Sequence, residues 1–388
     1  MSFAHRYIET AEKIIHNYDG NVPLQHFLKQ FFAADKKYGS KDRKAITHAC
    51  YCYYRLGSVK TDSISSRIRL GLFLCTDEPG IWKNVFEDDW IPDWSNDLAD
   101  RIRFVSGKID MKEIFPLYDQ LSDKIDKDAF AVSHLVQPDL HLRIRPGNKK
   151  KVITALTQAQ VSFTEPINSC LALLNGTKID QVLQLNKEVV VQDLSSQRVQ
   201  EFLEIVPTKK NLKVWDCCAA SGGKSILASD HFTTIDLTVS DVRPSIIQNL
   251  KKRFADAGIK NYKSFVTDLT NCRLINHDSS FDLIICDAPC SGSGTWSRTP
   301  EQLSYFKQEK ISHYTNLQRK IALNVIPSLA KNGYLLYITC SVFQQENEDV
   351  VQYILQNSTL QLVKMEYLEG YEKKADTMFA ALFTASTP

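Results

Sequence analysis

Two cysteines stand out because polar and glycine residues surround them. Cys290 lies in the run DAPCSG at positions 287–292, and Cys340 lies in the run TCS at positions 339–341. Each run follows an apolar segment that is typical of a buried strand. Open α/β sheets build their sites at the carboxyl ends of strands, and a thiolate is a strong nucleophile. Both cysteines are therefore candidate reactive residues.

Most of the 10 cysteines in the chain are expected to be inert. A free cysteine usually behaves as a small buried hydrophobic residue, and Cys217, Cys272 and Cys286 are assigned to this class. Neither Cys290 nor Cys340 has a cysteine or histidine partner at the spacing of metal ligands, so we expect no metal site. The cysteine spacing also lacks the density of a disulfide scaffold, which fits a reducing compartment.

A second candidate site is a glycine turn, formed by Cys218, Ala219, Ala220, Ser221, Gly222, Gly223 and Lys224. It joins an expected strand at residues 213–218 to an expected helix, where α/β sheets bind nucleotides against glycine backbone and a helix N-terminus. The end of this turn matches a P-loop, but Cys218 stands where the first P-loop glycine would fall, which argues against a nucleoside triphosphatase. A bare strand-to-helix turn remains an alternative.

Two carboxylates follow the next two expected strands. Asp241 ends the strand at 236–241, near the position where a doubly wound fold places the carboxylate that holds ribose hydroxyls. Asp268 follows the strand at 262–266 and is positioned to meet an adenine amino group or a loop backbone. With the glycine turn, these residues suggest an adenosine ligand. The alternative for each aspartate is a helix N-cap, and Asp241 lies shortly before Pro244.

The elements that must position these residues alternate between strand and helix after residue 210. Apolar strands are expected at 213–218, 236–241, 262–266, 281–286 and 334–340, with helices between them, which predicts a parallel sheet covered on both faces. Short apolar runs at 138–207 predict a small α+β module, and helical periodicity before residue 130 predicts a bundle. The predicted domains are 1–130, 131–210 and 211–388.

Composition limits the class of protein. The chain has 388 residues, of which 43% are hydrophobic and 24% charged, as in an ordinary globular protein of two or three domains. No apolar run approaches the roughly 18 residues of a membrane span, and residues 1–15 lack a signal or transit pattern, so we expect a soluble cytoplasmic protein. The net charge of +2 means that a polyanion must be met by local patches.

Taken in order, the motifs at 218–224, 287–290 and 339–341 resemble those of the RsmB/Nop-Sun family of RNA (cytosine-5)-methyltransferases. The run QDLSSQ at 192–197 resembles the segment before that family's catalytic domain, and LRIR at 142–145 is similar to its small RNA-contacting module. The resemblance implies a Rossmann-like methyltransferase domain, preceded by this module and by an N-terminal NusB-like helical domain. The sequence departs from the family at Ser221, where proline is usual, and at Arg145, where asparagine is common.

The resemblance also implies a reaction. S-adenosylmethionine would be the cofactor, held by the glycine turn with Asp241, Asp268 and Asp287, and the product would be 5-methylcytosine in RNA, with 16S ribosomal RNA as the substrate. Cys340 would attack C6 of the cytosine, Asp287 would hydrogen-bond N3, and Cys290 would assist release of the C5 proton. The residues alone do not say which cysteine attacks, because DNA enzymes use the Pro-Cys one.

Two basic clusters are candidate RNA contacts. The first contains Arg143, Arg145, Lys149, Lys150 and Lys151, and the second contains Lys36, Lys37, Lys41, Arg43 and Lys44, diluted by Asp42. A solvated charged face is the alternative, favoured more for the second cluster. A different functional class is a non-catalytic RNA-binding or ribosome assembly factor on the same scaffold, against which the intact cysteines argue. The family implies a monomer.

Overall fold

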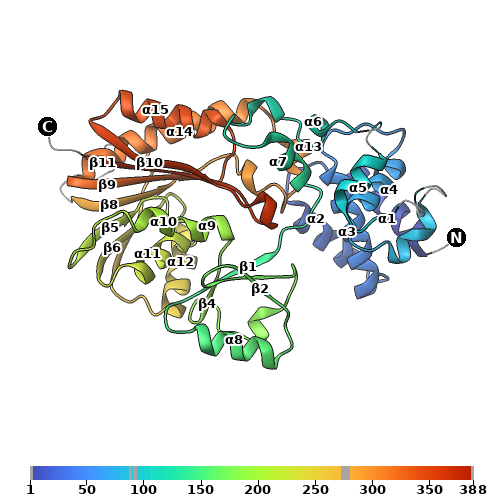
Figure 1. Cartoon of the computed structure of the whole chain (residues 1–388), viewed down its shortest axis with the longest axis horizontal. Helices are drawn as coiled ribbons and strands as arrows, with labels where there is room; N and C mark the ends of the chain where they lie inside the picture. The colour runs from blue at the N-terminus through green and yellow to red at the C-terminus, as the bar shows by residue number, and fades with distance from the viewer. Residues whose placement is uncertain are drawn as a thin grey trace. The chain divides into compact units, whose positions relative to one another are not determined.

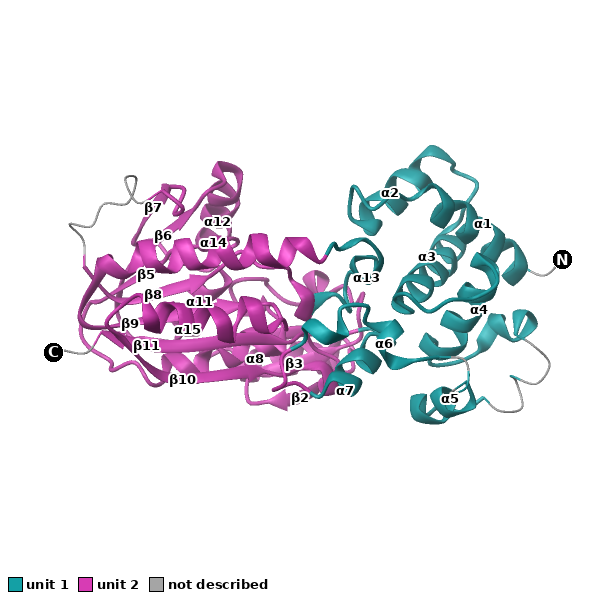
Figure 2. Cartoon of the chain, turned by 90° about the horizontal axis from the view of Figure 1, so that it is seen from above, with its two compact units in different colours: residues 1–121, 126–137, 295–307 teal, residues 122–125, 138–294, 308–388 magenta. Residues whose placement is uncertain are grey.

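The computed structural model of the protein describes residues 3–86, 90, 94–105, 107, 109–271 and 280–385. The chain divides into two compact units (Figure 2). Unit 1 contains residues 1–121, 126–137 and 295–307, and unit 2 contains residues 122–125, 138–294 and 308–388. The division into three domains stays a prediction. Within the described ranges, no helix is long and apolar enough to cross a membrane.

Unit 1 is helical, as the periodicity predicts. Its elements are α1 (Phe3–Asn17), α2 (Leu24–Ala34), α3 (Ser40–Arg55), α4 (Ile64–Cys75), η1 (Gly80–Val85), α5 (Leu98–Phe104), α6 (Met111–Ile114), η2 (Tyr118–Gln120), α7 (Lys127–Ser133) and α13 (Gln302–Tyr305). The last of these comes from far along the chain. The Tyr305 hydroxyl donates to the Tyr18 carbonyl at 2.7 Å, and the Glu301 carboxylate accepts the Leu24 amide at 3.1 Å. The segment after the Cys290 loop is therefore part of the helical core.

Unit 2 begins with the predicted α+β module. It contains β1 (Leu140–Ile144), α8 (Lys149–Gln158), β2 (Thr164–Ile167), β3 (Cys170–Leu173), η3 (Ile179–Gln181) and β4 (Val189–Val191). The strands form an antiparallel sheet in the order β2-β3-β1-β4. The strand β2 was not predicted. It contains Pro166 and lies at the sheet edge, where proline costs no ladder hydrogen bond.

The larger sheet of unit 2 has the order β10-β11-β9-β8-β5-β6-β7. Its strands are β5 (Leu212–Asp216), β6 (Ile235–Asp241), β7 (Tyr262–Val266), β8 (Phe281–Asp287), β9 (Leu329–Thr339), β10 (Leu360–Leu368) and β11 (Met378–Ala385). The first five match the predicted strands, and they pair in parallel. The predicted α/β class with a Rossmann-like sheet and a helical start is confirmed.

Helices cover both faces of this sheet (Figure 1). One face carries α10 (Gln200–Leu203), α11 (Gly223–His231) and α12 (Pro244–Asp256), and the other carries α14 (Glu309–Val325) and α15 (Glu348–Gln356). The remaining helical turns of unit 2 are α9 (Leu194–Arg198), η5 (Ser293–Thr295), η6 (Ile326–Ser328), η7 (Gln344–Glu346) and η8 (Tyr371–Lys373). Because both faces are covered, the central strands are apolar on both sides, which is why they appear in the sequence as continuous runs.

The sheet also contains two strands beyond the predicted parallel ones. β11 pairs antiparallel with both β9 and β10. These two last strands were not predicted. β11 is an apolar, almost entirely buried run like the central strands, whereas β10 is partly exposed and carries Lys364 and Glu366 among its apolar residues.

The strand order places a switch point between β5 and β8. The chain runs from β5 outward through β6 and β7 and then returns to β8 on the other side of β5. In doubly wound folds, the loops on the two sides of such a switch point leave the sheet in opposite directions and form the ligand crevice at its carboxyl edge. The glycine turn and both cysteine motifs follow strands at this edge.

Candidate active site

The two cysteine loops meet at the ends of adjacent parallel strands. β8 ends at Asp287 and β9 ends at Thr339, and Asp287 pairs with Ile338 in the ladder. Beyond these ends, the sulfurs of Cys290 and Cys340 lie 3.1 Å apart, and the Cys340 amide donates to the Cys290 sulfur at 3.4 Å. The sheet thus brings together the two predicted reactive residues from positions 50 apart in sequence.

Cys290 holds its proton more tightly than an ordinary cysteine does. The hydrogen bond with Cys340 is the largest cause that raises the pKa of Cys290, and burial and the negative charges of Cys340 and Glu346 raise it further. Two thiols this close do not both ionise readily, because each negative charge disfavours the other. The pair therefore favours a protonated Cys290.

Gly294 lets the two cysteine loops approach each other through their backbones. Its amide donates to the Cys340 carbonyl at 2.9 Å, and its carbonyl accepts the Thr377 amide at 2.9 Å. A Cβ atom at this position would lie 2.0 Å from the Thr377 carbonyl oxygen and 3.1 Å from the Cys340 carbonyl oxygen. Only glycine fits this close approach.

The glycine turn after β5 is held by its own backbone. Gly222 has a φ of +83°, and its amide donates to the Ala219 carbonyl at 2.7 Å. A Cβ atom on Gly222 would lie 2.5 Å from the Phe254 ring, whereas one on Gly223 would meet nothing within 4 Å. The first glycine is needed for the turn, and the second leaves open space at the start of α11. The remaining turn residues, Cys218, Ala220 and Ser221, lie on the same loop.

The two predicted ligand carboxylates have different surroundings. Asp241 is buried at the end of β6, and its carboxylate accepts the Ala220 amide at 3.1 Å and the Arg243 amide at 2.9 Å. It therefore links the second strand to the glycine turn. The N-cap residue of α12 is Arg243, and its side chain makes no cap hydrogen bond, so Asp241 is not the N-cap of this helix. Asp268 is exposed, and its carboxylate accepts the Thr270 amide and hydroxyl at 2.9 and 2.7 Å, which lowers its pKa.

Lys224 connects the glycine turn to the cysteine side. Its ammonium donates to the Asp287 carboxylate at 3.1 Å and to the Ser196 hydroxyl at 2.8 Å. The Lys224 side chain is only 9% exposed, whereas that of Asp287 is 28% exposed, so the carboxylate keeps a face open to a ligand. The roles of these residues stay predictions. The bond from Lys224 to Asp287 joins the glycine turn to the end of β8.

Asp216 is a site residue that the sequence reasoning missed. It ends β5 and is fully buried, its Oδ2 accepts the Ser225 hydroxyl, and its Oδ1 has no hydrogen-bond partner among the described residues. Burial is the largest cause that raises the pKa of Asp216 to about 7, and the charge of Asp287 raises it further. An acid at the end of an otherwise apolar strand was the available signal.

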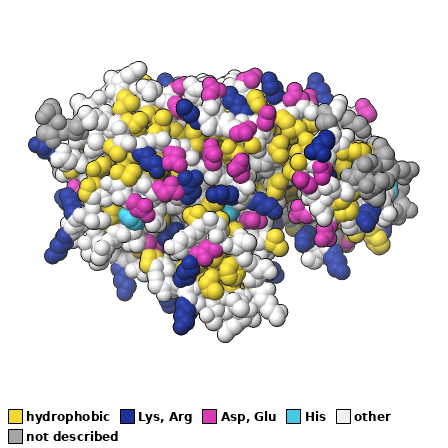
Figure 3. Space-filling model, viewed as in Figure 1, with side chains coloured by type: hydrophobic (Ala, Val, Ile, Leu, Met, Phe, Trp, Pro, Cys, Tyr) yellow, Lys and Arg dark blue, Asp and Glu magenta, His cyan; other side chains and the backbone are white. Residues whose placement is uncertain are grey.

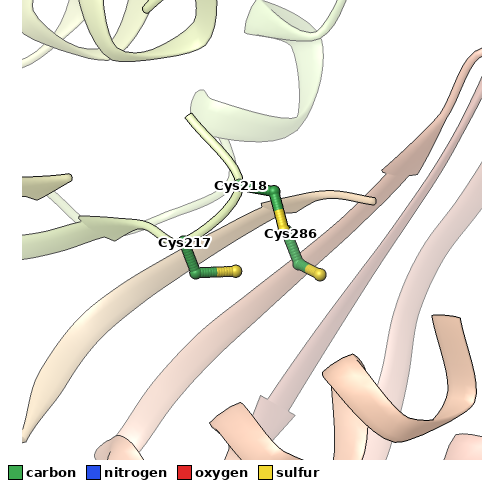
Figure 4. Close-up of side chains that lie close together, drawn as sticks. All are labelled: Cys217, Cys218 and Cys286. Atoms are coloured by element: carbon green, nitrogen blue, oxygen red, sulfur yellow. The ribbon is translucent and has the colours of Figure 1, made fainter. Parts of the chain in front are cut away.

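Three other cysteines lie close together behind the turn (Figure 4). The sulfurs of Cys217, Cys218 and Cys286 are all within 4.8 Å of one another, and Cys217 and Cys286 are buried as expected. Structural zinc sites take four ligands. In the described part of the chain, no fourth His, Cys, Asp or Glu joins this group. The absence of a metal stays a prediction, and Cys272 lies outside the described residues.

The first basic cluster is largely paired within the protein. Arg143 and Arg145 both bind the Asp230 carboxylate, at 2.6 and 2.7 Å. Lys149 pairs with Glu165 and Lys151 with Glu188, each at 2.6 Å, and Lys150 is exposed. Most of these cations therefore stabilise unit 2, where they border a cleft of about 670 Å³.

Charge is mixed over the visible surface as well. Among the described residues on the face in Figure 3, Lys and Arg side chains are interspersed with Asp and Glu. In the second basic cluster, Lys37 pairs with Asp35 at 2.6 Å, and Lys36, Lys41, Arg43 and Lys44 are exposed. An RNA strand would therefore meet small patches of positive charge, as the net charge indicates.

The strand order, the glycine turn and the cysteine pair define a Rossmann-like methyltransferase domain. Residues 203–383 match the family model described as 16S rRNA methyltransferase RsmB/F. This part of the chain is similar to that family.

Curated relatives are similar to part of the chain as well. Ribosomal RNA small subunit methyltransferase B of Xylella fastidiosa is 32% identical over 168 residues, which are 43% of this chain and 39% of the relative. The 28S rRNA (cytosine-C(5))-methyltransferase of Mus musculus is 29% identical over 156 residues, 39% of this chain and 19% of that protein. The matches thus cover well under two thirds of these relatives.

Solved structures share the fold. The crystal structure of PH0851 has a TM-score of 0.70 and 19% identity, and the match covers 98% of each chain. The structure of NSun6 from Pyrococcus horikoshii with SFG has a TM-score of 0.60 and 14% identity, over 71% of this chain and 98% of that one. The similarity to PH0851 extends over nearly the whole chain, so the helical and α+β regions share that fold as well.

Proposed function

We propose that this protein methylates C5 of a cytosine in RNA with S-adenosylmethionine as the methyl donor, and that its substrate is small-subunit ribosomal RNA. One observation carries the proposal: two sulfurs lie 3.1 Å apart, at the sheet edge that also carries the glycine turn. Cytosine C5 is a poor nucleophile, and a thiolate that adds to C6 makes C5 electron-rich. Two adjacent thiols suit a reaction in which one sulfur attacks C6 and the other helps to remove the C5 proton.

The residues at the crevice fit the cofactor. The left-handed turn at Gly222 and the open space at Gly223 permit close approach to the backbone at the start of α11. Asp241 would hold ribose hydroxyls in place of its bond with Arg243. Asp268 would hold the adenine amino group in place of its bond with Thr270. When bound, S-adenosylmethionine supplies an electrophilic methyl group on a sulfonium centre. Cys218, Ala219, Ala220, Ser221 and Lys224 complete the proposed binding loop.

The chain's own residues divide the chemistry. The Cys340 thiolate adds to C6, and Asp287 hydrogen-bonds N3 as negative charge develops on the ring. Two causes of the raised pKa of Cys290 are the hydrogen bond and the charge of Cys340, and both are lost once that sulfur is bonded to carbon. Cys290 then releases its proton to solvent more easily, and its thiolate can accept the C5 proton after C5 has taken up the methyl group. The C6 to sulfur bond breaks, which restores the Cys340 thiolate.

The substrate must present its base outside a stacked helix. An enzyme that reacts with a pyrimidine ring carbon needs an unpaired loop or an extruded nucleotide. The exposed Lys150 and the cleft beside Arg143 are candidate contacts for the flanking strand. The proposal includes a cytoplasmic location and action as a monomer.

Bisulfite sequencing of ribosomal RNA tests the function. Cells with the gene should retain one protected cytosine in small-subunit RNA that cells without it lose, and Cys340→Ala should fail to restore it. Calorimetry with S-adenosylmethionine separates the enzyme from a scaffold role: the Cys340→Ala variant should bind as tightly as wild type. No binding by the wild-type protein would favour an assembly factor.

A further inference from the structure

Glu346 is a buried acid next to the cysteine pair that the mechanism above does not use. It ends η7, six positions after Cys340, and its side chain is fully buried. One carboxylate oxygen accepts the Ser291 amide at 2.9 Å and the Gln318 amide group at 2.8 Å. The other accepts the Ser341 hydroxyl at 2.8 Å.

These bonds connect both cysteine loops through one side chain. Ser291 directly follows Cys290, and Ser341 directly follows Cys340. Gln318, on α14, also donates to the Pro289 carbonyl at 3.0 Å, so the loop before Cys290 is held from the same point. The geometry makes Glu346 a brace across the two loops, in addition to the backbone contact at Gly294.

The hydrogen bonds of Glu346 match an ionised carboxylate. The Ser341 hydroxyl accepts the Phe343 amide at 3.1 Å, so its proton is free to point to the carboxylate. The Ser291 amide and the Gln318 amide group are donors as well. Three donors on two oxygens match a carboxylate, which only accepts. Burial raises the pKa of Glu346, and these bonds oppose the shift.

The negative charge of Glu346 acts on Cys290. It raises the pKa of Cys290, as stated above. Tyr314 on α14 and Tyr337 on β9 also lie within electrostatic reach of Cys290, but both have a raised pKa and stay neutral near pH 7. Among the described residues, Cys340 and Glu346 are therefore the groups whose charge sets the ionisation of Cys290.

We propose that Glu346 is a positioning residue that holds the Cys290 and Cys340 loops together and places its negative charge beside Cys290, so that Cys340 is the sulfur that attacks. The inference deepens the proposed function and rests on it for its meaning in catalysis. It also gives a physical reason for the choice between two cysteines that residue chemistry leaves open.

Alkylation of the full chain by iodoacetamide, without RNA or cofactor, tests the charge of Glu346. Mass spectrometry would follow Cys290 and Cys340 separately from pH 6 to 10. In wild type, Cys290 should react only at a higher pH than an ordinary thiol does, because its pKa is raised. In Glu346→Gln, which removes the charge at nearly constant volume, the Cys290 profile should move down by about one pH unit. An unchanged Cys290 profile in this variant would overturn the proposed effect of the Glu346 charge.

A matched control lies two positions away. Glu348 accepts from Tyr367 at 2.9 Å and from Ser122, and neither of these partners lies on a cysteine loop. Glu348→Gln should leave both alkylation profiles as in wild type, and an equal shift there would also contradict the proposal. Gln318→Met removes a donor to Glu346 and leaves its charge less compensated, so Cys290 should shift in the opposite direction, to higher pH. Gln318→Met therefore tests the effect of the Glu346 charge on Cys290 even if Glu346→Gln does not fold.

Hydrogen exchange tests the brace itself. In Glu346→Ala, the Ser291 amide should lose its protection at least tenfold, whereas amides of β5 should keep theirs. Unchanged protection at Ser291 would show that Glu346 does not hold this loop. Neither readout needs methyl transfer, so an inactive wild-type protein would count against the proposed function and leave the results on Glu346 standing.

Discussion

The two sides of the proposed site are built in different ways. On the side of β5 and β6, the glycine turn is fixed by local backbone geometry, with Gly222 in the left-handed region and Asp241 bonded to Ala220. On the side of β8 and β9, the cysteine loops are fixed by bonds between segments far apart in sequence, through Gly294 and Glu346. Local constraints shape the cofactor side, and long-range contacts shape the reactive side.

This difference predicts that the two sides fail separately. A change in the cysteine loops should reduce methyl transfer while cofactor binding persists. A change in the glycine turn should weaken cofactor binding while the two sulfurs stay close. Lys224, which bonds to Asp287 across the crevice, is the contact through which a change on one side could reach the other.

The largest effect is expected from Gly294→Ala. The added Cβ would lie 2.0 Å from the Thr377 carbonyl oxygen, so the loop must move away from Cys340. A displacement of about 1 Å in reacting groups costs roughly a hundredfold in rate. Methyl transfer to RNA should fall by about that factor, and calorimetry should show unchanged binding of S-adenosylmethionine. Loss of binding in this variant would mean that the two sides are not independent.

A smaller effect is expected from Gly222→Ala. The left-handed backbone and the contact with Phe254 together should cost about 2 kcal/mol of folding stability. Denaturant unfolding measures this cost, and calorimetry should show weaker cofactor binding. Gly223→Ala is the matched control for stability, because its Cβ meets nothing within 4 Å. Equal destabilisation by both substitutions would contradict the role assigned to the turn.

The buried acid behind the turn should give a pH-dependent effect. Burial raises the pKa of Asp216 to about 7, so the folded protein holds this proton more tightly than the unfolded chain does. Stability from this group is present below the unfolded pKa of roughly 4 and is lost as pH rises toward 7. Relative to Asp216→Asn, wild type should lose on the order of 1 kcal/mol per pH unit in this window. Denaturant midpoints at pH 5 and pH 7 check the trend, and a constant difference would refute it.

The smallest effect is expected at Arg253. Its guanidinium donates to the Ser221 hydroxyl at 2.8 Å and to Asn186 at 2.9 Å, so it holds the turn at the residue where the family usually has proline. Arg253→Met should weaken S-adenosylmethionine binding a few-fold, because a partly exposed contact contributes on the order of 1 kcal/mol. Lys252→Met, an exposed neighbour on α12, should have no effect. Equal affinity in both variants would show that Ser221 needs no support.

Sequence reasoning predicted the parts of the site that depend on local patterns. The strands β5 to β9, the glycine turn and the two cysteine motifs all follow from apolar runs and the residues directly after them. The roles of Glu346 and Asp216 could not be predicted in this way. Glu346 acts on Ser291 from a distance of 55 positions, and the sequence contains no local sign of that bond.

The pairing of the basic residues with distant acids was the other feature that sequence alone could not predict. Arg143 and Arg145 share a strand and its flank with no acid between them, which made them candidate RNA contacts. Their partner Asp230 is more than 80 positions away on α11, and only the fold brings it to them. A run of basic residues therefore indicates an RNA surface only where no distant acid folds against it.

The most direct test of the account is to trap the bond between protein and RNA. The Cys290→Ala variant, incubated with S-adenosylmethionine and unmodified small-subunit ribosomal RNA, should accumulate a covalent protein–RNA complex because the C5 proton is no longer removed. Peptide mapping by mass spectrometry should place the nucleotide on Cys340. A complex attached to any other residue, or full methyl transfer by Cys340→Ala, would contradict the account.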